Sequence, residues 1–129
     1  MNKILVEVSV GELLDKISIL EIKKEKIKDS EKLKFINDEY EVLKNELEKN
    51  IKIDAKLTKL FVALKNINSK LWIIEDDKRL CEKNSDFGEK FIKLSRDIHF
   101  LNDKRASIKL EINNQTGSKI KEIKEYTSY

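Results

Sequence analysis

The residues best suited to chemistry lie close together in the segment SRDIHFLNDKRAS, residues 95–107. It holds two of the three arginines, Arg96 and Arg105, and the only histidine, His99. Arginine has a planar guanidinium that pairs with two carboxylate or phosphate oxygens at once. A histidine beside a carboxylate changes its charge near neutral pH. The segment therefore indicates either a cluster of ion pairs between helices or a binding site for an anion.

A second polar group lies earlier in the chain, within residues 68–79. Five of its side chains recur at helical spacing: Asn68, Trp72, Glu75, Asp76 and Arg79. A short turn near residues 84 and 85 would pair this helix in antiparallel fashion with the helix of the first segment. In this arrangement we expect Arg79 to pair with Glu82 or Glu89.

The two polar groups are expected to meet between the paired helices. Antiparallel packing brings Arg96 level with Trp72, so Arg96 and His99 would lie against Glu75 or Asp76, with Trp72 as a wall. As ordinary ion pairs, these contacts fix the register of the helices and contribute little stability. The alternative is that the same side chains hold a ligand.

Arg105 is expected in a different environment, because it falls within the apolar seam of its helix. A guanidinium in such a place must be paired or must line a cleft. If the first helix packs alongside, Asp15 and Glu21 are the candidate partners. Arg96 lies about 180° from Arg105 around the helix. One small anion is therefore not expected to bridge these two arginines.

Composition and charge narrow the class of protein. Residues 1–129 are the size of one domain, and 40% apolar with 40% charged residues is typical of amphipathic helices. The net charge of +3 arises from interspersed acids and lysines, whereas nucleic-acid binding requires cations gathered on one surface. Nucleic acid is therefore not expected as a partner.

The sequence lacks the residues that several other classes of protein require. The single cysteine, Cys81, excludes a disulfide framework within the chain and a zinc site built on cysteine pairs. Metal-binding helical bundles often carry Glu-x-x-His, and that pattern is absent. We therefore expect no metal, no cofactor and no assigned catalytic residue. No apolar stretch is long enough to span a membrane, which favours a cytoplasmic protein without membrane insertion.

Helix-capping residues divide the chain into elements. The predicted N-caps are Ser9, Asp29 or Ser30, Asp54 and Asp86. Ser9 and Glu12 together have the spacing of a capping box. Residues 2–9 alternate in polarity, which predicts a short strand, and Gly117 suits a left-handed helix exit. The tail, residues 119–129, is open between a strand, a short helix and a frayed end.

These elements predict an all-α fold: an antiparallel bundle of about four helices with coiled-coil-like seams, a short N-terminal strand and, as one option, a C-terminal strand. The last two helices form a hairpin about 45 Å long, against roughly 30 Å for the first two. Part of the hairpin seam is then uncovered. Either the terminal segments or a second copy should cover it, and we expect a homodimer.

Four stretches resemble one known family: residues 7–23, 71–82, 91–113 and 117–126. They are similar to the bacterial domain-of-unknown-function family 6165 and cover most of the chain. The motif positions that this resemblance implies are Trp72, Glu75, Asp76, Arg79, Arg96, Asn102, Asp103, Arg105, Gly117 and Tyr126. His99 stands where similar proteins are expected to have tyrosine, which weakens a catalytic role for it. The resemblance implies no reaction, and it implies an association with cell-surface polysaccharide synthesis, for example with glycosyltransferases.

Two functional hypotheses follow from the sequence. The preferred one is an interaction or accessory module that self-associates or binds a protein such as a glycosyltransferase. The alternative is a small-molecule enzyme or binding protein in which Arg96 and Arg79 hold an anion beside Trp72, with Glu75 as acid or base. The sequence leans against an enzyme. The candidate ligand-binding residues are Trp72, Glu75, Asp76, Arg79, Arg96, His99, Asn102, Asp103 and Arg105.

Overall fold

The computed structural model describes residues 3–119, 123–124 and 127–128, and it contains four helices. They are α1 (Val10–Lys26), α2 (Ser30–Asn50), α3 (Ala55–Lys83) and α4 (Glu89–Thr116). The predicted all-α class is confirmed. No strand occurs within the described ranges, so the N-terminal strand was wrong. Ile4, Leu5 and Val6 are exposed instead, because no segment among the described residues pairs with this short stretch as a strand. The option of a C-terminal strand falls largely on residues outside the description.

The helix starts follow the predicted caps in three of four cases. Ser9 accepts from the Glu12 backbone N–H (3.1 Å), and Asp54 accepts from that of Leu57 (2.8 Å). For the second helix the cap is Asp29. A cap side chain of this kind satisfies a backbone donor that the helix leaves unpaired.

The predicted cap at Asp86 was wrong, because α4 begins at Glu89 after Gly88. The Asp86 backbone N–H donates to the Cys81 carbonyl at 2.8 Å, and Ser85 has a left-handed φ of 53°. This pattern is typical of the end of a helix. The backbone of Asp86 therefore caps the last turn of α3 instead of starting α4. At the far end of α4, Gly117 has a φ of 67°, which confirms the predicted left-handed exit.

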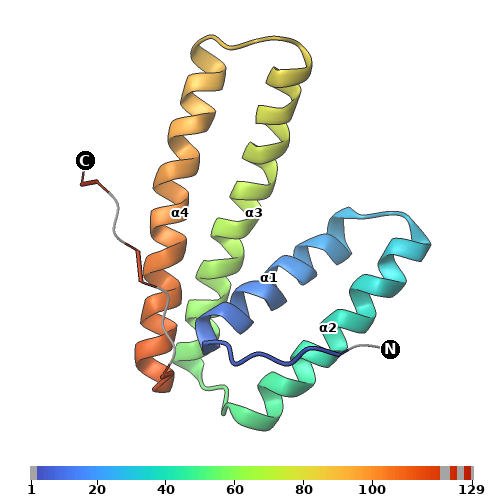
Figure 1. Cartoon of the computed structure of the whole chain (residues 1–129), viewed down its shortest axis with the longest axis vertical. Helices are drawn as coiled ribbons and strands as arrows, with labels where there is room; N and C mark the ends of the chain where they lie inside the picture. The colour runs from blue at the N-terminus through green and yellow to red at the C-terminus, as the bar shows by residue number, and fades with distance from the viewer. Residues whose placement is uncertain (1–2, 120–122, 125–126, 129) are drawn as a thin grey trace.

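The long pair α3 and α4 forms an antiparallel hairpin, and α1 crosses its lower half (Figure 1). Helix α1 packs against all three other helices, whereas α2 packs mainly against α1. Helix α1 is therefore the central helix of the bundle. The upper half of the hairpin extends beyond α1 and α2 (Figure 1).

The hydrophobic core lies where all four helices meet, at the lower end of the hairpin. Its buried members are Leu14, Ile17, Leu47, Leu57, Leu64 and Ile112. Complete burial of a leucine or isoleucine stabilises a fold by roughly 1.5–3 kcal/mol. This cluster therefore fixes α1 against the hairpin.

The start of α1 lies directly against the end of α4. A Cβ added to Gly11 would lie 2.6 Å from the Lys109 carbonyl oxygen, a distance that only glycine tolerates. The Gly11 backbone N–H donates to Asn113 Oδ1 at 2.7 Å, and Asn113 is fully buried. The side-chain amide of Asn113 in α4 thus accepts from a backbone N–H at the N-terminus of α1 that has no partner within its own helix.

Replacing Asn113 with alanine should lower the free energy of unfolding by about 1–3 kcal/mol, because the buried Gly11 N–H loses its acceptor. Urea denaturation measures this loss. Asn66→Ala is the matched control, since Asn66 is exposed within α3, and it should change stability little. Equal effects of the two substitutions would contradict the assignment.

Candidate functional site

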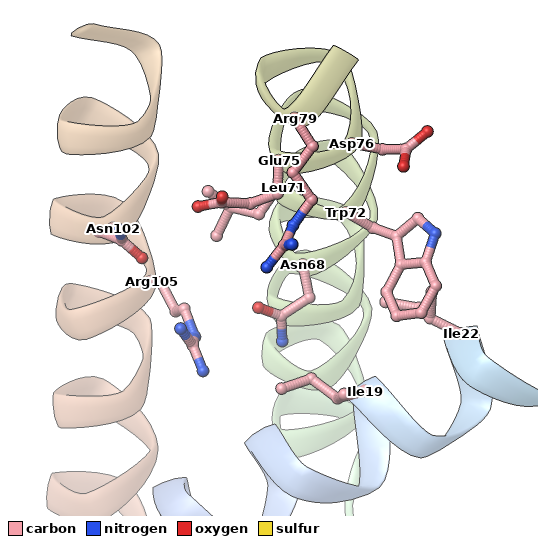
Figure 2. Close-up of a pocket in the computed structure, with 10 residues that line it drawn as sticks. All are labelled: Ile19, Ile22, Asn68, Leu71, Trp72, Glu75, Asp76, Arg79, Asn102 and Arg105. Carbon is pink, nitrogen blue, oxygen red and sulfur yellow. The ribbon is translucent and has the colours of Figure 1, made fainter. Parts of the chain in front are cut away.

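A cleft of about 470 Å³ lies between α1 and the hairpin. Its lining residues are Ile19, Ile22, Asn68, Leu71, Trp72, Glu75, Asp76, Arg79, Asn102 and Arg105 (Figure 2). Six of the nine predicted ligand-binding residues are among them. This volume lies at the small end of the range for ligand pockets.

A buried carboxylate, Asp15 of α1, lies beneath the cleft and is only 1% exposed. Arg105 donates from Nε to Asp15 Oδ1 (3.0 Å) and from Nη2 to Oδ2, which makes a bidentate pair. The predicted pairing of Arg105 with an acid of the first helix is confirmed for Asp15. Glu21, the other candidate, binds Lys65 at 3.1 Å instead.

Asn68 of α3 completes this buried network. Its Nδ2 donates to Asp15 Oδ1 (2.8 Å) and to Ser18 Oγ (2.7 Å). The Ser18 hydroxyl in turn donates to the Asp15 carbonyl oxygen at 2.8 Å. Because Asp15, Asn68 and Arg105 come from three different helices, the network fixes their relative positions under the cleft.

The surroundings of Asp15 hold its carboxyl in the charged form. Burial alone would raise the pKa of Asp15, because the carboxylate loses its hydration. Hydrogen bonds from Arg105 and Asn68, together with the positive charges of Arg105 and Lys109, outweigh burial and bring the pKa below its usual value of 3.8. Asp15 is therefore an anion that holds Arg105 in place.

Other acids of α1 also pair with cations of the hairpin. Glu12 accepts from Lys109 of α4 at 2.8 Å. Lys65 of α3 bridges Glu21 (3.1 Å) and Glu25 (2.8 Å). These pairs are more exposed than that of Asp15 and contribute less. Together they orient α1 along both helices of the hairpin.

Arg79 differs from Arg105 because no acid among the described residues holds it. Two acids lie one helical turn before it, Glu75 and Asp76, yet within the described part of the chain Arg79 makes no ion pair with either. The predicted pairing with Glu82 or Glu89 is also not formed. Figure 2 shows the Arg79 guanidinium directed down α3 toward Asn68, into the cleft that Arg105 enters from α4.

The opposite side of the cleft is apolar. Trp72 is half-buried, and its indole lies over Ile22 of α1 (Figure 2). Ile19 continues this side toward the bottom of the cleft. Glu75 points toward α4, whereas Asp76 points away from it (Figure 2). The cleft therefore joins a polar, arginine-lined part to an apolar part with an aromatic ring.

The predicted meeting of Arg96 and His99 with Glu75 or Asp76 was wrong. Arg96, His99 and Asp103 line a different groove of about 750 Å³ on the other side of α4, together with Lys124 and Thr127 of the tail. Arg96 and Arg79 therefore cannot hold one ligand beside Trp72. The predicted separation of Arg96 from Arg105 by half a turn of helix agrees with this placement.

The error has two physical causes. The N-cap of α4 is Gly88 instead of the predicted Asp86, which lengthens the turn by two residues and moves the register. As a result Asn102 lies level with Trp72, and Arg105 lies level with Asn68 (Figure 2). In addition, Arg96 lies on the face of α4 opposite to the one that contacts α1 and α3.

Sequence reasoning named Asp15 only as a partner of Arg105, and it left Asn68 and Ser18 outside the candidate site. The available signal was a stripe on α1 at steps of four, three and four residues: Gly11, Asp15, Ser18 and Ile22. All four are buried. Small and polar residues at these helical positions indicate a face that packs closely and pairs its polar groups.

The chain belongs to a family of unknown function, DUF6165, whose model matches residues 4–129. Comparison with curated proteins and with solved structures found no significant match. Tyr126, one of the motif positions implied by the resemblance, lies outside the described residues.

Among the residues that are described, no group of three or more His, Cys, Asp or Glu side chains is placed to hold a metal ion. None of the described helices is long and apolar enough to cross a membrane.

Replacing Arg105 with glutamine should lower the free energy of unfolding by about 3 kcal/mol, the lower end for a buried pair that loses one partner. The lower end applies because Lys109 remains 3.8 Å from Asp15. Thermal and urea denaturation measure the loss. Arg96→Gln is the matched control and should stay within about 0.5 kcal/mol of the unchanged protein. A loss below about 1 kcal/mol for Arg105→Gln would argue against the pair as the main support of the cleft.

Asp15 should also make stability depend on pH in the acid range. As the pH falls through about 3.9, the unfolded chain binds a proton on Asp15, while the folded protein with its lowered pKa does so only at lower pH. The stabilisation by Asp15 is therefore complete above about pH 5 and is lost progressively as the pH falls below that value.

Unfolding free energies measured from pH 5 downward check this dependence. Below about pH 4, the unfolding free energy of Asp15→Asn should fall less steeply with decreasing pH than that of the unchanged protein. The difference corresponds to at most one bound proton, or about 1.4 kcal/mol per pH unit. Asp38→Asn, on the exposed face of α2, should keep the slope of the unchanged protein. An unaltered slope in Asp15→Asn would show that another group causes the acid loss.

Proposed function

We propose that the chain is an accessory binding module that holds an anionic ligand in the cleft between α1, α3 and α4. The observation that carries this proposal is Arg79, whose guanidinium enters the cleft without an acidic partner among the described residues. Two acids lie within reach on its own helix, and neither pairs with it. An anion in the cleft would supply the missing partner.

Arg105 supports the proposal in a different way. Its charge is offset by Asp15, so Arg105 contributes a fixed guanidinium rather than an uncompensated charge. A donor held in place before binding loses little conformational entropy when a ligand arrives. Arg79 would therefore supply most of the attraction for an anion, and Arg105 the fixed wall against which it binds.

This proposal modifies the ligand-binding hypothesis from the sequence, because Arg105 takes the place of Arg96 beside Arg79 and Trp72. It keeps the expectation of a binding rather than a catalytic role. It also keeps an accessory role near cell-surface polysaccharide synthesis, for which the support is the resemblance in sequence alone. A glycosyltransferase as protein partner and a cytoplasmic location stay predictions.

Self-association of the long hairpin is the second candidate function. It is favoured by exposed apolar side chains on the hairpin, where Ile73, Leu80 and Ile92 are each about half exposed. Exposed apolar area of this kind is often covered by another protein. The homodimer therefore also stays a prediction.

Isothermal titration with inorganic phosphate and with citrate tests anion binding. Binding of at least one of them should weaken about tenfold or more in Arg79→Gln, because a charge-assisted hydrogen bond contributes about 1.5–3 kcal/mol. Arg79 is exposed and has no described partner, so its loss should leave the melting temperature unchanged.

Arg96→Gln serves as the control with the same chemical change in the other groove, and it should bind like the unchanged protein. Equal binding by the two variants would place the anion outside the cleft. If phosphate, citrate and organic phosphates all failed to bind to the unchanged protein, the proposed function would be overturned.

A further inference from the structure

We infer that the ligand of the cleft is a phosphate monoester attached to a ring, with the phosphate between Arg79 and Arg105 and the ring against Trp72. This inference rests on the proposed function, and it names the chemical class that the cleft would select. It follows from three features: the directions of the two guanidiniums, the amide of Asn102, which has no hydrogen-bond partner among the described residues, and the apolar side formed with α1.

The two guanidiniums favour phosphate over carboxylate. They enter the cleft from different helices, Arg79 from α3 and Arg105 from α4 (Figure 2). A carboxylate has two oxygens in one plane, which suit a single bidentate arginine. A phosphate monoester has three terminal oxygens in a tetrahedral arrangement and carries up to two negative charges. It can therefore meet donors that approach from two directions.

Asn102 provides a neutral donor on the same side of the cleft. Its side chain lines the cleft from α4, level with Trp72 (Figure 2). Within the described residues no hydrogen bond of its amide is found, in contrast to Asn68, which donates to both Asp15 and Ser18. Asn102 is thus placed to donate to an ester or phosphate oxygen above Arg105.

The other end of the cleft suits a ring. Trp72 lies on the side of α3 that faces away from Arg105. Ile19 and Ile22 of α1 extend its apolar surface (Figure 2). Stacking of a base on an aromatic side chain contributes about 1–3 kcal/mol. A bare anion would leave this surface unused. A ligand that spans the cleft needs its ring and its charge at opposite ends, as in a phosphate monoester of a nucleoside or a sugar.

Glu75 and the volume restrict the ligand further. Glu75 points toward α4 at the upper end of the cleft (Figure 2), where its carboxylate can accept from hydroxyl groups and repels additional negative charge. A volume of about 470 Å³ holds one phosphate with one or two rings. These two features favour a monophosphate over a longer polyphosphate.

Trp72 is the only tryptophan of the chain, so its fluorescence reports directly on the cleft. The experiment titrates the protein with uridine monophosphate, glucose 6-phosphate, inorganic phosphate, uridine and citrate, by calorimetry and by fluorescence in parallel. At least one of the two phosphate monoesters should bind tenfold or more tightly than inorganic phosphate, uridine or citrate. Quenching of Trp72 by the nucleotide identifies a nucleobase as the ring, and tighter binding of glucose 6-phosphate identifies a sugar.

Variants of Trp72 separate ring contact from structure. Trp72→Leu should weaken the preferred monoester at least fivefold by calorimetry while leaving the affinity for inorganic phosphate unchanged. Trp72→Phe keeps an aromatic face and should recover most of the loss. Phe100→Leu, an aromatic substitution in the other groove, should change neither affinity.

The outcomes distinguish this inference from the proposed function. If phosphate or citrate binds in a manner that depends on Arg79, but neither monoester binds more tightly, the phosphate-ester inference is overturned and the anion-binding function stands. Tighter binding of citrate than of both monoesters would likewise overturn the phosphate-ester inference and leave the anion-binding function standing. If none of these compounds binds, both proposals fail.

Discussion

The arrangement of this protein depends on a carboxylate that is buried where three helices meet. Asp15 receives two hydrogen bonds from Arg105 and one from Asn68, so one side chain of α1 is tied to both helices of the hairpin. A buried charge without partners destabilises a fold by several kcal/mol. The three helices are therefore constrained to the one packing in which Asp15 is satisfied. The apolar core at the lower end of the hairpin contributes most of the driving force, and the Asp15 network selects the position.

This constraint also explains why the cleft lies where α1 crosses the hairpin. Helix α1 crosses the hairpin instead of running along it, so the hairpin continues above the last contact with α1 (Figure 1). The cleft opens at this crossing, over the buried network. Arg105 is held by the network on one side of the cleft, whereas Arg79 enters from α3 and has no acidic partner among the described residues. The cleft thus combines one fixed guanidinium with one whose charge is uncompensated, beside an aromatic wall.

Much of the fold followed from the sequence, because local signals determine helix ends. Ser9, Asp54 and Gly117 acted as predicted, and helical periodicity gave four helices. The site was predicted less completely, since it depends on register. The residue predicted opposite Trp72 was Arg96, whereas the structure places Asn102 there, six residues further along α4, and no local pattern specifies that difference. The N-terminal alternation predicted a strand because periodicity does not reveal whether a partner strand exists.

A double-mutant cycle between Asp15 and Arg105 tests the central claim most directly. It uses Asp15→Asn, Arg105→Gln and the double variant, with the free energy of unfolding measured for each by urea denaturation at neutral pH. If the pair organises the junction, the double variant should be more stable than the sum of the single losses predicts, with a coupling energy of about 1–3 kcal/mol. Additive losses, with a coupling near zero, would show that the two side chains act independently and that the cleft has a different support.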